Sequence, residues 1–243
     1  MSLPKVSCLC PTYGRPECLE EAIHSFLIQD YLGEKELVIV NDLPSQKLIF
    51  DHPQVRIVNL PEEVCCLGRK FNLTAKAATG EVLCVWDDDD IFLPHRLSYS
   101  IERLKNGLFH TWNAFYLSAE NLVEPAYNLF HSCLAIHRDT FWGVGGYEEV
   151  DRMNVDRKLI YDLYKEYGHF STEIPQSDYF YIYRWDVTGN YHVSKWDNDS
   201  VSHSVKEYVS QKNQEGRLRT GEIVLQTHWA QDYCHLKKAG EGA

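Results

Sequence analysis

The stretch Val82-Leu83-Cys84-Val85-Trp86-Asp87-Asp88-Asp89-Asp90 joins a short apolar run directly to four consecutive aspartates. An apolar run this short is typical of a buried strand. Four adjacent carboxylates repel one another unless a positive charge lies among them. Residues i and i+2 of an extended chain point the same way, so Asp87 and Asp89 could share one cation. The stretch therefore predicts a buried strand that ends in a metal-binding loop; the alternative is a solvated acidic turn that caps the next helix.

Short apolar runs and amphipathic helical patterns alternate along the first half of the chain. The apolar runs cover residues 6–10, 37–40, 55–60 and 82–86. Between them, apolar residues recur at helical spacing over 19–27 and 67–79, and Pro94 suits the start of a further helix through Leu104. Strands that are apolar throughout and alternate with helices predict an α/β fold, with a mostly parallel central sheet and helices on both of its faces.

Polar, loop-forming residues follow three of these apolar runs. They are Pro11-Thr12-Tyr13 after the first run, Asn41-Asp42 after the second, and the four aspartates after the run at 82–86. In open α/β sheets, ligands bind beyond the carboxyl ends of the parallel strands. We therefore expect these three segments to meet at one edge of the sheet and to form a ligand-binding site.

The composition argues against two classes of partner. Thirty-five acidic residues against 24 Lys and Arg give a formal net charge of -11, and the chain contains no basic run. Because nucleic-acid binding draws much of its affinity from Lys and Arg on phosphates, we expect no nucleic-acid partner. No segment approaches the roughly 18 consecutive apolar residues that a membrane-spanning helix needs, so we expect no membrane span.

The eight cysteines follow no disulfide framework. Several lie inside apolar runs, and the chain has no Cys-x-x-Cys pair of the kind that holds structural zinc. This usage is typical of buried, reduced thiols, and it predicts a cytoplasmic protein.

Several segments, in the order in which they occur, resemble the signature of family 2 glycosyltransferases, which have the GT-A fold. Cys10-Pro11-Thr12-Tyr13-Gly14-Arg15 resembles the family's first strand and loop, and Glu36-Leu37-Val38-Ile39-Val40-Asn41-Asp42 resembles its second. Gly68-Arg69-Lys70-Phe71-Asn72, Ala78-Thr79-Gly80-Glu81 and the run into the four aspartates resemble its central motifs. Phe141-Trp142-Gly143-Val144-Gly145-Gly146-Tyr147-Glu148-Glu149 resembles the segment that precedes the catalytic base.

This resemblance implies a metal-dependent enzyme that transfers a hexosyl or deoxyhexosyl group from a nucleoside-diphosphate sugar, with inversion, to a hydroxyl of a carbohydrate or glycoconjugate. It implies Mn²⁺ or Mg²⁺ as the cofactor and UDP as the nucleotide, with GDP or dTDP as alternatives. The residues that it places at the nucleotide are Pro11, Thr12, Tyr13, Arg15, Asp42, Arg69, Asp87 and Asp88. Those that it places at the metal are Asp89, Asp87 and His192, with His203 as a further candidate.

The reaction also needs a base, because the acceptor hydroxyl must lose its proton as it attacks. In the family this base is an Asp that follows the Gly-Gly turn, and Asn154-Val155-Asp156-Arg157 occupies that place. Asp156 is the only acid in this motif, so we expect it to be the base, with Asp151 as the alternative. A surface aspartate that caps the next helix is the simpler interpretation of Asp156.

The second half of the chain has weaker patterns. Residues 159–167 have helical spacing, 179–185 resemble a strand, and 189–204 resemble a polar loop. The charged tail at 210–221 is expected to be mobile, with a short helix from Ile223 onward. We expect one GT-A catalytic domain over 1–205, with a nucleotide-binding half to about 107 and an acceptor half over 108–205. A partly helical C-terminal extension would cover 206–243.

Three other functions share some of these features. A catalytically inactive module that binds nucleotide sugars would keep the nucleotide side of the site and lose the base. A metal-dependent nucleotidyltransferase would also use paired aspartates, but it usually carries a glycine-rich, basic phosphate loop near its first strand. This chain has only Gly14-Arg15 at that place. A glycoside hydrolase needs two carboxylates that flank the bond, which does not explain three strand ends that converge.

Overall fold

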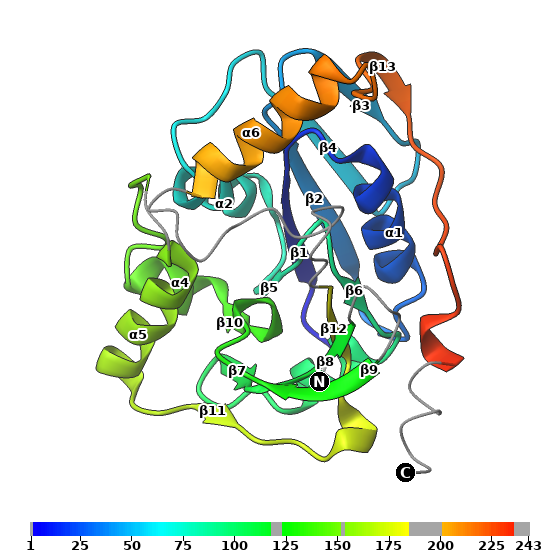
Figure 1. The fold of residues 1–243 in the computed structure, drawn as a ribbon. Coiled ribbons are helices and arrows are strands. Elements are labelled where there is room, and N and C mark those ends of the chain that lie inside the picture. The colour runs from blue at the N-terminus through cyan, green and yellow to red at the C-terminus, as the bar shows by residue number, and fades with distance from the viewer. Residues whose placement is uncertain (1, 118–122, 152–153, 185–200, 236–243) are drawn as a thin grey trace.

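The strand that leads into the four aspartates, β5 (Val82–Val85), lies at the centre of a seven-stranded sheet (Figure 1). The computed structural model describes residues 2–117, 123–151, 154–184 and 201–235, with the backbone alone for 201–205. The strands of this sheet follow the order β11-β7-β10-β5-β1-β2-β4. The bounds of the other six are Ser171–Thr172 (β11), Leu108–Thr111 (β7), Ala135–His137 (β10), Val6–Thr12 (β1), Lys35–Asn41 (β2) and Val55–Asn59 (β4).

The strands β5, β1, β2 and β4 run parallel, so their carboxyl ends lie at one edge of the sheet. In the register of β1, Leu9 lies opposite Val38 of β2 and opposite Val85 of β5. β10 runs antiparallel to both of its neighbours, β5 and β7. The expected α/β fold with a mostly parallel central sheet is confirmed.

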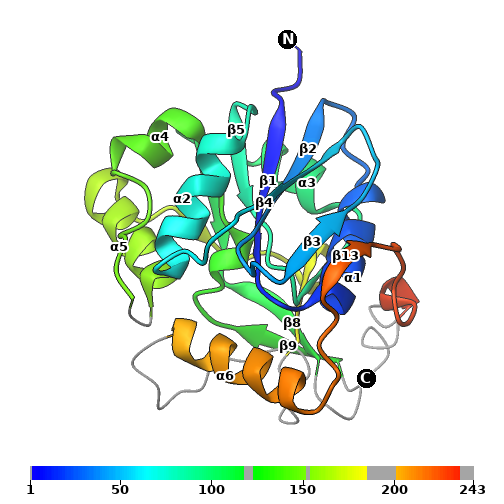
Figure 2. The same ribbon diagram turned by 90° about the horizontal axis from the view of Figure 1, so that it is seen from above.

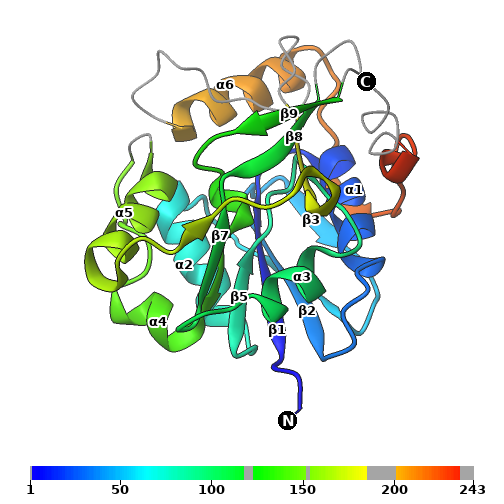
Figure 3. The same cartoon turned by 90° about the horizontal axis from the view of Figure 1, so that it is seen from below.

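Helices cover both faces of this sheet (Figures 2 and 3). α1 (Pro16–Leu27) and α3 (Arg96–Glu102) lie on one face, and α2 (Leu67–Ala77), α4 (Arg138–Gly143) and α5 (Val155–Tyr167) lie on the other. Successive side chains of a strand alternate between the faces. Cys8 and Cys10 of β1 therefore pack in the core beneath α1, whereas Leu9 packs in the core beneath α2. Burial on both faces explains why these strands are apolar throughout.

A second sheet lies next to the four aspartates and has the order β6-β12-β8-β9. The bounds of its strands are Ile91–Phe92 (β6), Tyr181–Arg184 (β12), Asn113–Leu117 (β8) and Val123–Tyr127 (β9). Two 3₁₀ helices, η1 (His131–Cys133) and η2 (Gln176–Asp178), precede β10 and β12. Because β6 directly follows the aspartates and pairs with β12, the end of β12 is brought to the aspartate loop.

The last part of the described chain folds back onto the first half. α6 (Val201–Gln214) lies beyond the carboxyl ends of the parallel strands, on the side opposite the N-terminus (Figures 2 and 3). β13 (Gly221–Val224) pairs in parallel with β3 (Gln46–Ile49). Ile223 lies in β13 and does not begin a helix, although residues 233–235 are helical; the expected mobility of 210–221 stays a prediction. Val209 and Ile223 are buried against the first half, a tertiary contact that the charged local sequence does not show.

Most of the other expected elements are confirmed, with ends that shift by a few residues. The helix expected to start at Pro94 is α3, which begins at Arg96. β3 was not expected, because its pairing depends on a strand far away in the chain. The predicted domain boundary at 205/206 falls inside α6. Among the residues that the structure describes, no helix combines the length and the apolar character needed to cross a membrane.

Replacing Trp86 by alanine should lower the free energy of unfolding by about 3–5 kcal/mol, because a large void would open in the core. The indole is fully buried, stacks on Phe92 with ring centroids 4.1 Å apart and donates a hydrogen bond to the carbonyl of Ala22 (3.1 Å). Urea denaturation measures the effect. Leu32→Ala is the control, because Leu32 is 93% exposed and should change stability by at most about 0.5 kcal/mol. Equal losses for the two variants would contradict the packing described.

Candidate active site

Arg15, in the loop between β1 and α1, balances the negative charge of the two middle aspartates, Asp88 and Asp89. Its guanidinium nitrogens lie 2.5 Å from a carboxylate oxygen of Asp88 and 2.6 Å from one of Asp89. All three side chains are buried. Asp88 also accepts a hydrogen bond from the hydroxyl of Thr12 at 2.6 Å. The end of β1 and the loop after β5 therefore meet, as the sequence predicted.

The two outer aspartates of the loop have different surroundings. Asp90 is buried and accepts hydrogen bonds from the hydroxyl of Tyr181 (2.5 Å) and from the backbone N–H of Arg184 (2.7 Å). Asp87 is only partly buried and accepts a hydrogen bond from the hydroxyl of Ser132 in η1. Asp90 thus joins the aspartate loop to β12, and Asp87 is the more accessible carboxylate.

Arg184 is a second buried cation at this loop, and the sequence did not reveal it. Its Nε donates a hydrogen bond to the backbone carbonyl of Asp89 (2.6 Å), and its guanidinium forms an ion pair with Glu21 of α1. Tyr233 donates its hydroxyl hydrogen to Glu21 as well (3.0 Å). The only signal in the sequence is a charged residue at the end of an aromatic strand. Nothing local identifies Glu21 as the group that it pairs with.

Burial and mutual repulsion raise the pKa values of these carboxyl groups. The pKa of Asp87 rises to about 7, mainly because of burial and then because of the negative charge of Asp89. Burial also raises the pKa of Asp88, where Arg15 opposes the effect, and the pKa of Asp90. For Arg15, burial acts to lower the pKa, but Asp88 and Asp89 outweigh it and raise it. Burial is thus the main cause of the raised carboxyl pKa values, and the neighbouring negative charges add to it.

The oxygen donors at the end of β5 suit a hard divalent cation. Mg²⁺ and Mn²⁺ prefer oxygen ligands, and Mg²⁺ usually takes one or two carboxylates together with water and substrate phosphates. Asp87 and Asp89 offer such a pair. Within the described ranges, no group of three or more His, Cys, Asp or Glu side chains is placed to hold a metal ion. The residues therefore fit a cation shared with a bound diphosphate, rather than one enclosed by the protein alone.

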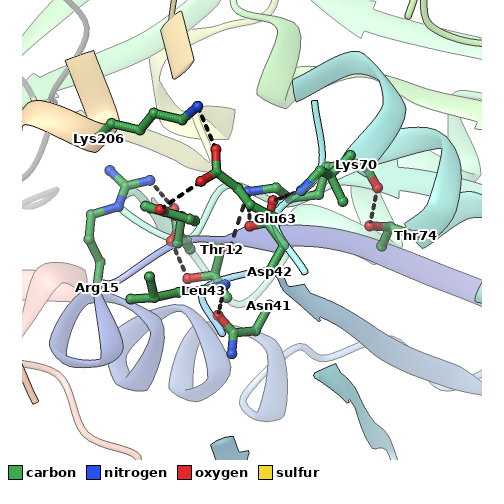
Figure 4. A network of polar contacts seen from close by, with 12 residues as sticks. Thr12, Arg15, Asn41, Asp42, Leu43, Glu63, Lys70, Thr74 and Lys206 are labelled. Atoms are coloured by element: carbon green, nitrogen blue, oxygen red, sulfur yellow. Dashed lines mark hydrogen bonds and ion pairs between the residues drawn. The ribbon is translucent and has the colours of Figure 1, made fainter. Parts of the chain in front are cut away.

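The end of β2 supplies another acid, which is paired with a lysine of α2 (Figure 4). Asp42 is buried; its Oδ1 lies 2.5 Å from Nζ of Lys70, and its Oδ2 accepts a hydrogen bond from the backbone N–H of Val64 (3.0 Å). Lys70 also donates to the carbonyl of Thr12 (3.4 Å) and lies over the ring of Tyr13 (5.2 Å to the centroid). Burial lowers the pKa of Lys70, and Asp42 opposes this shift. All three predicted strand ends are thus connected.

The cation of α2 that reaches these strand ends is Lys70, which the sequence did not single out. Arg69, which the resemblance placed near a diphosphate, has an exposed side chain. Successive residues of a helix point about 100° apart, so only one of these two neighbours can face the sheet. Pro11 is buried at the end of β1, and Tyr13 is partly buried beside Lys70.

α6 borders the same region from the outside. Val209 packs on Gly14, where a Cβ atom would lie only 2.5 Å from Cγ2 of Val209. Gly14 also has a φ of +70°, so both its backbone and its surroundings require glycine. Nζ of Lys206 lies 2.6 Å from Oε1 of Glu63, and Glu63 accepts a hydrogen bond from the hydroxyl of Tyr13 (3.3 Å) (Figure 4). Residues far apart in the chain therefore enclose the side of the site formed by Tyr13 and Asp42.

Asp156 lies in the first turn of α5, after Asn154, which has a left-handed backbone (φ 67°). Its side chain is partly buried, and its charge acts on three groups. Burial is the main cause that raises the pKa of Asp87 and of Tyr147, and Asp156 adds to both. Burial lowers the pKa of His131 to about 4, and Asp156 opposes this shift. α5 also packs against η1, whose Ser132 contacts Asp87, so α5 lies on the side of the site that Asp87 occupies.

The remaining predicted site residues are Asp151, His192 and His203. Asp151 is exposed, and its charge acts on Lys206 of α6. His192 lies outside the described residues, and for His203 only the backbone is given. Their roles at a metal or as a base stay predictions.

The parallel sheet, the helices on both faces and the aspartate loop at the central strand define a glycosyltransferase of the GT-A type. Residues 7–145 match the family described as "Glycosyl transferase family 2", and this is more than half of the chain. The chain belongs to glycosyltransferase family 2. It is also similar to "Uncharacterized glycosyltransferase YwdF" of Bacillus subtilis (strain 168), with 22% identity over 211 residues that cover 84% of this chain and 69% of the relative.

Solved structures of S. aureus TarS have the same fold. TarS 1–349 covers 74% of this chain with a TM-score of 0.57 and 15% identity, and this chain spans 60% of its length. The complex of TarS 1–349 with UDP gives a TM-score of 0.58 at 14% identity, over 74% of this chain and 60% of TarS. The complex with UDP-GlcNAc gives 0.59 at 14% identity, over 86% and 66%. At such low identity, the similarity shows the fold.

The pairing of Arg15 with Asp88 should be visible as a coupling energy. A double-mutant cycle with Arg15→Gln and Asp88→Asn should give about 1–3 kcal/mol in the free energy of unfolding, because the two buried groups compensate each other. Urea denaturation of the four proteins measures it. The exposed i,i+4 pair Lys158–Asp162 is the control and should give about 0.5 kcal/mol or less. Additive effects at Arg15 and Asp88 would contradict the ion pair.

Proposed function

We propose that this chain is a metal-dependent glycosyltransferase that moves a hexosyl or deoxyhexosyl group from a nucleoside-diphosphate sugar to an acceptor hydroxyl, with inversion at the anomeric carbon. The observation that carries the proposal is the meeting of three strand ends in one network of contacts. Asp88 contacts Thr12, and Lys70 joins Thr12 to Asp42. In α/β folds this edge of the sheet is where ligands bind.

The proposed nucleotide is UDP, with GDP and dTDP as alternatives. The TarS structures contain UDP and UDP-GlcNAc, and they share the fold of this chain. Asp42 is placed to accept a hydrogen bond from the base or the ribose, since it is an acid at the end of β2. The ring of Tyr13, beside Lys70, offers an aromatic face to the base. Pro11 and Thr12 complete this side of the pocket.

The proposed cofactor is Mn²⁺ or Mg²⁺, with Asp87 and Asp89 as its protein ligands. When bound, such an ion supplies Lewis-acid stabilisation of the negative charge that leaves with the nucleoside diphosphate. Arg15 is already held against Asp89, at 2.6 Å, and so a cation is present beside the ligand pair. Asp88 holds Arg15 in place from the other side.

The proposed base is Asp156, which takes the proton of the acceptor hydroxyl as the oxygen attacks. Asp156 lies in the first turn of α5, with a partly buried side chain. Attack by the acceptor on the side opposite the leaving group inverts the anomeric carbon. A single displacement of this kind needs no covalent sugar–enzyme intermediate.

We place the acceptor, a carbohydrate or glycoconjugate, in the half formed by residues 108–205, which holds Asp156. We also propose a cytoplasmic location. All eight cysteines lie among the described residues and are present as thiols, which is typical of a reducing compartment.

Metal-dependent donor binding can be measured by titration calorimetry with UDP. Mn²⁺ should tighten UDP binding, and Asp89→Asn should weaken the Mn²⁺-dependent affinity by at least about tenfold, the lower end of what losing a metal-site residue costs. Removal of the ion with a chelator should have the same effect on the unaltered protein. Asp51→Asn, an exposed acid between β3 and β4, is the control.

Equal UDP affinity with and without Mn²⁺ would contradict metal dependence, and no binding of any of the three nucleotides would contradict the donor class. UDP binding without any turnover of a UDP-sugar would favour the inactive binding module. Formation of pyrophosphate from a nucleoside triphosphate would favour the nucleotidyltransferase.

Asp156→Asn should lower kcat by about a hundredfold to ten-thousandfold, the usual contribution of a positioned base. The affinity for UDP and Mn²⁺ should stay near that of the unaltered protein, because Asp156 is not proposed as a ligand of either. Steady-state kinetics with a radiolabelled donor measures kcat, and NMR of the product gives the anomeric configuration. Asp151→Asn is the matched control. Full activity of Asp156→Asn, or a product that retains its configuration, would refute this base.

A further inference from the structure

The loop before α2 contains two adjacent cysteines, Cys65 and Cys66. Their sulfur atoms lie 3.7 Å apart. Cys65 is the one exposed cysteine of the eight in the chain, all of which the structure describes, and Cys66 is buried. An exposed thiol beside a second thiol is the arrangement of a redox-sensitive site, in which the first sulfur reacts and the second resolves the product.

The two residues before these cysteines contact the nucleotide side of the site, and Figure 4 shows one of them, Glu63, beside Lys206. Val64 donates its backbone N–H to Asp42 (3.0 Å), and Glu63 accepts the hydroxyl hydrogen of Tyr13 (3.3 Å). Glu63 also pairs with Lys206 of α6 (2.6 Å). The backbone of residues 63–66 therefore links the ends of β1 and β2 to α6.

A bond between the two sulfurs must distort this backbone. Adjacent Cα atoms across a trans peptide are about 3.8 Å apart, whereas the Cα atoms of an ordinary disulfide are about 4.4–6.8 Å apart. The peptide between Cys65 and Cys66 must therefore twist. Strained disulfides of this kind are reduced more readily than structural ones, which makes the change reversible.

The helix side of the loop cannot absorb this twist. Gly68 packs on the backbone of Glu148 so closely that a Cβ atom would lie 2.1 Å from its carbonyl oxygen. The backbone N–H of Lys70 is bonded to the carbonyl of Cys66 (3.2 Å), which fixes the first turn of α2. The movement must be taken up by residues 63–65, and these hold the hydrogen bond to Asp42.

We propose that Cys65 and Cys66 form a redox-sensitive dithiol, which a low-molecular-weight disulfide such as oxidised glutathione converts to a vicinal disulfide that weakens nucleotide binding. The thiolate of Cys65 attacks one sulfur of oxidised glutathione and releases one glutathione. The thiolate of Cys66 then attacks the sulfur of Cys65 and releases the second. Two thiols and one glutathione disulfide thus give one protein disulfide and two glutathione molecules. Cys65 acts first because it is exposed, whereas burial of Cys66 raises its pKa and shields it from glutathione. The effect on nucleotide binding rests on the proposed function.

The test compares the reduced full-length chain with the chain treated with oxidised glutathione. Mass spectrometry of the peptide that contains both cysteines should show the loss of two hydrogens and no retained glutathione. Hydrogen–deuterium exchange over residues 60–66 should become faster, because the bond between Val64 and Asp42 is lost. The Kd for UDP should rise by about tenfold or more, because Asp42 loses the N–H that orients it and with it a charge-assisted hydrogen bond to the nucleotide. Dithiothreitol should reverse all three changes.

Three variants make the test specific. Cys65→Ser and Cys66→Ser should show neither the exchange change nor the UDP change, and serine at 66 is a favourable residue at the start of a helix. Cys234→Ser, at a half-buried cysteine remote in the chain, should respond as the unaltered protein does.

A stable glutathione adduct on Cys65 would overturn the closure of the disulfide. If the disulfide forms and hydrogen–deuterium exchange over residues 60–66 stays the same, the proposed effect of the disulfide on Asp42 is wrong. If the reduced chain does not bind UDP, the proposed function fails. Mass spectrometry and hydrogen–deuterium exchange then still test whether the two cysteines form a disulfide that loosens the loop.

Discussion

Four carboxylates on consecutive residues are the constraint on which the arrangement of this protein depends. Their mutual repulsion, in a loop that is largely buried, must be compensated by groups from elsewhere. Arg15 compensates Asp88 and Asp89 from the first loop of the chain. Arg184 and Tyr181 reach Asp90 from the second sheet. Each compensating group fixes another element, so the electrostatics of one loop hold the first strand, the central strand and β12 together.

This compensation is unequal along the loop. Asp88 and Asp90 are enclosed by hydrogen bonds, whereas Asp87 keeps a partly exposed carboxylate whose pKa rises to about 7 because of burial and of Asp89. Asp88 and Asp90 thus hold neighbouring elements together, whereas Asp89 is paired with Arg15 and Asp87 is the most accessible of the four. The four residues therefore have different surroundings, although they are consecutive in the chain.

The nucleotide side of the site is built in a similar way from distant parts of the chain. Lys70 links Asp42 to the end of β1, and α6 closes over Tyr13 and Gly14. The loop at 63–66 connects these parts through Glu63 and Val64. Glu63 and Val64 thus connect Tyr13, Asp42 and Lys206, which lie in three different parts of the chain.

The sequence by itself determined the α/β order, the central strand, the three polar strand ends and membership of a glycosyltransferase family. These features are local: an apolar run, a helical spacing or a turn residue has the same meaning wherever it occurs. Tertiary structure alone decided that Lys70 rather than Arg69 faces the sheet and that β13 pairs with β3. It also decided the pairing of Glu21 with Arg184, 163 positions apart in the chain. Such contacts depend on which faces meet after folding. The sequence around Glu21 therefore does not predict Arg184 as its partner, nor the reverse.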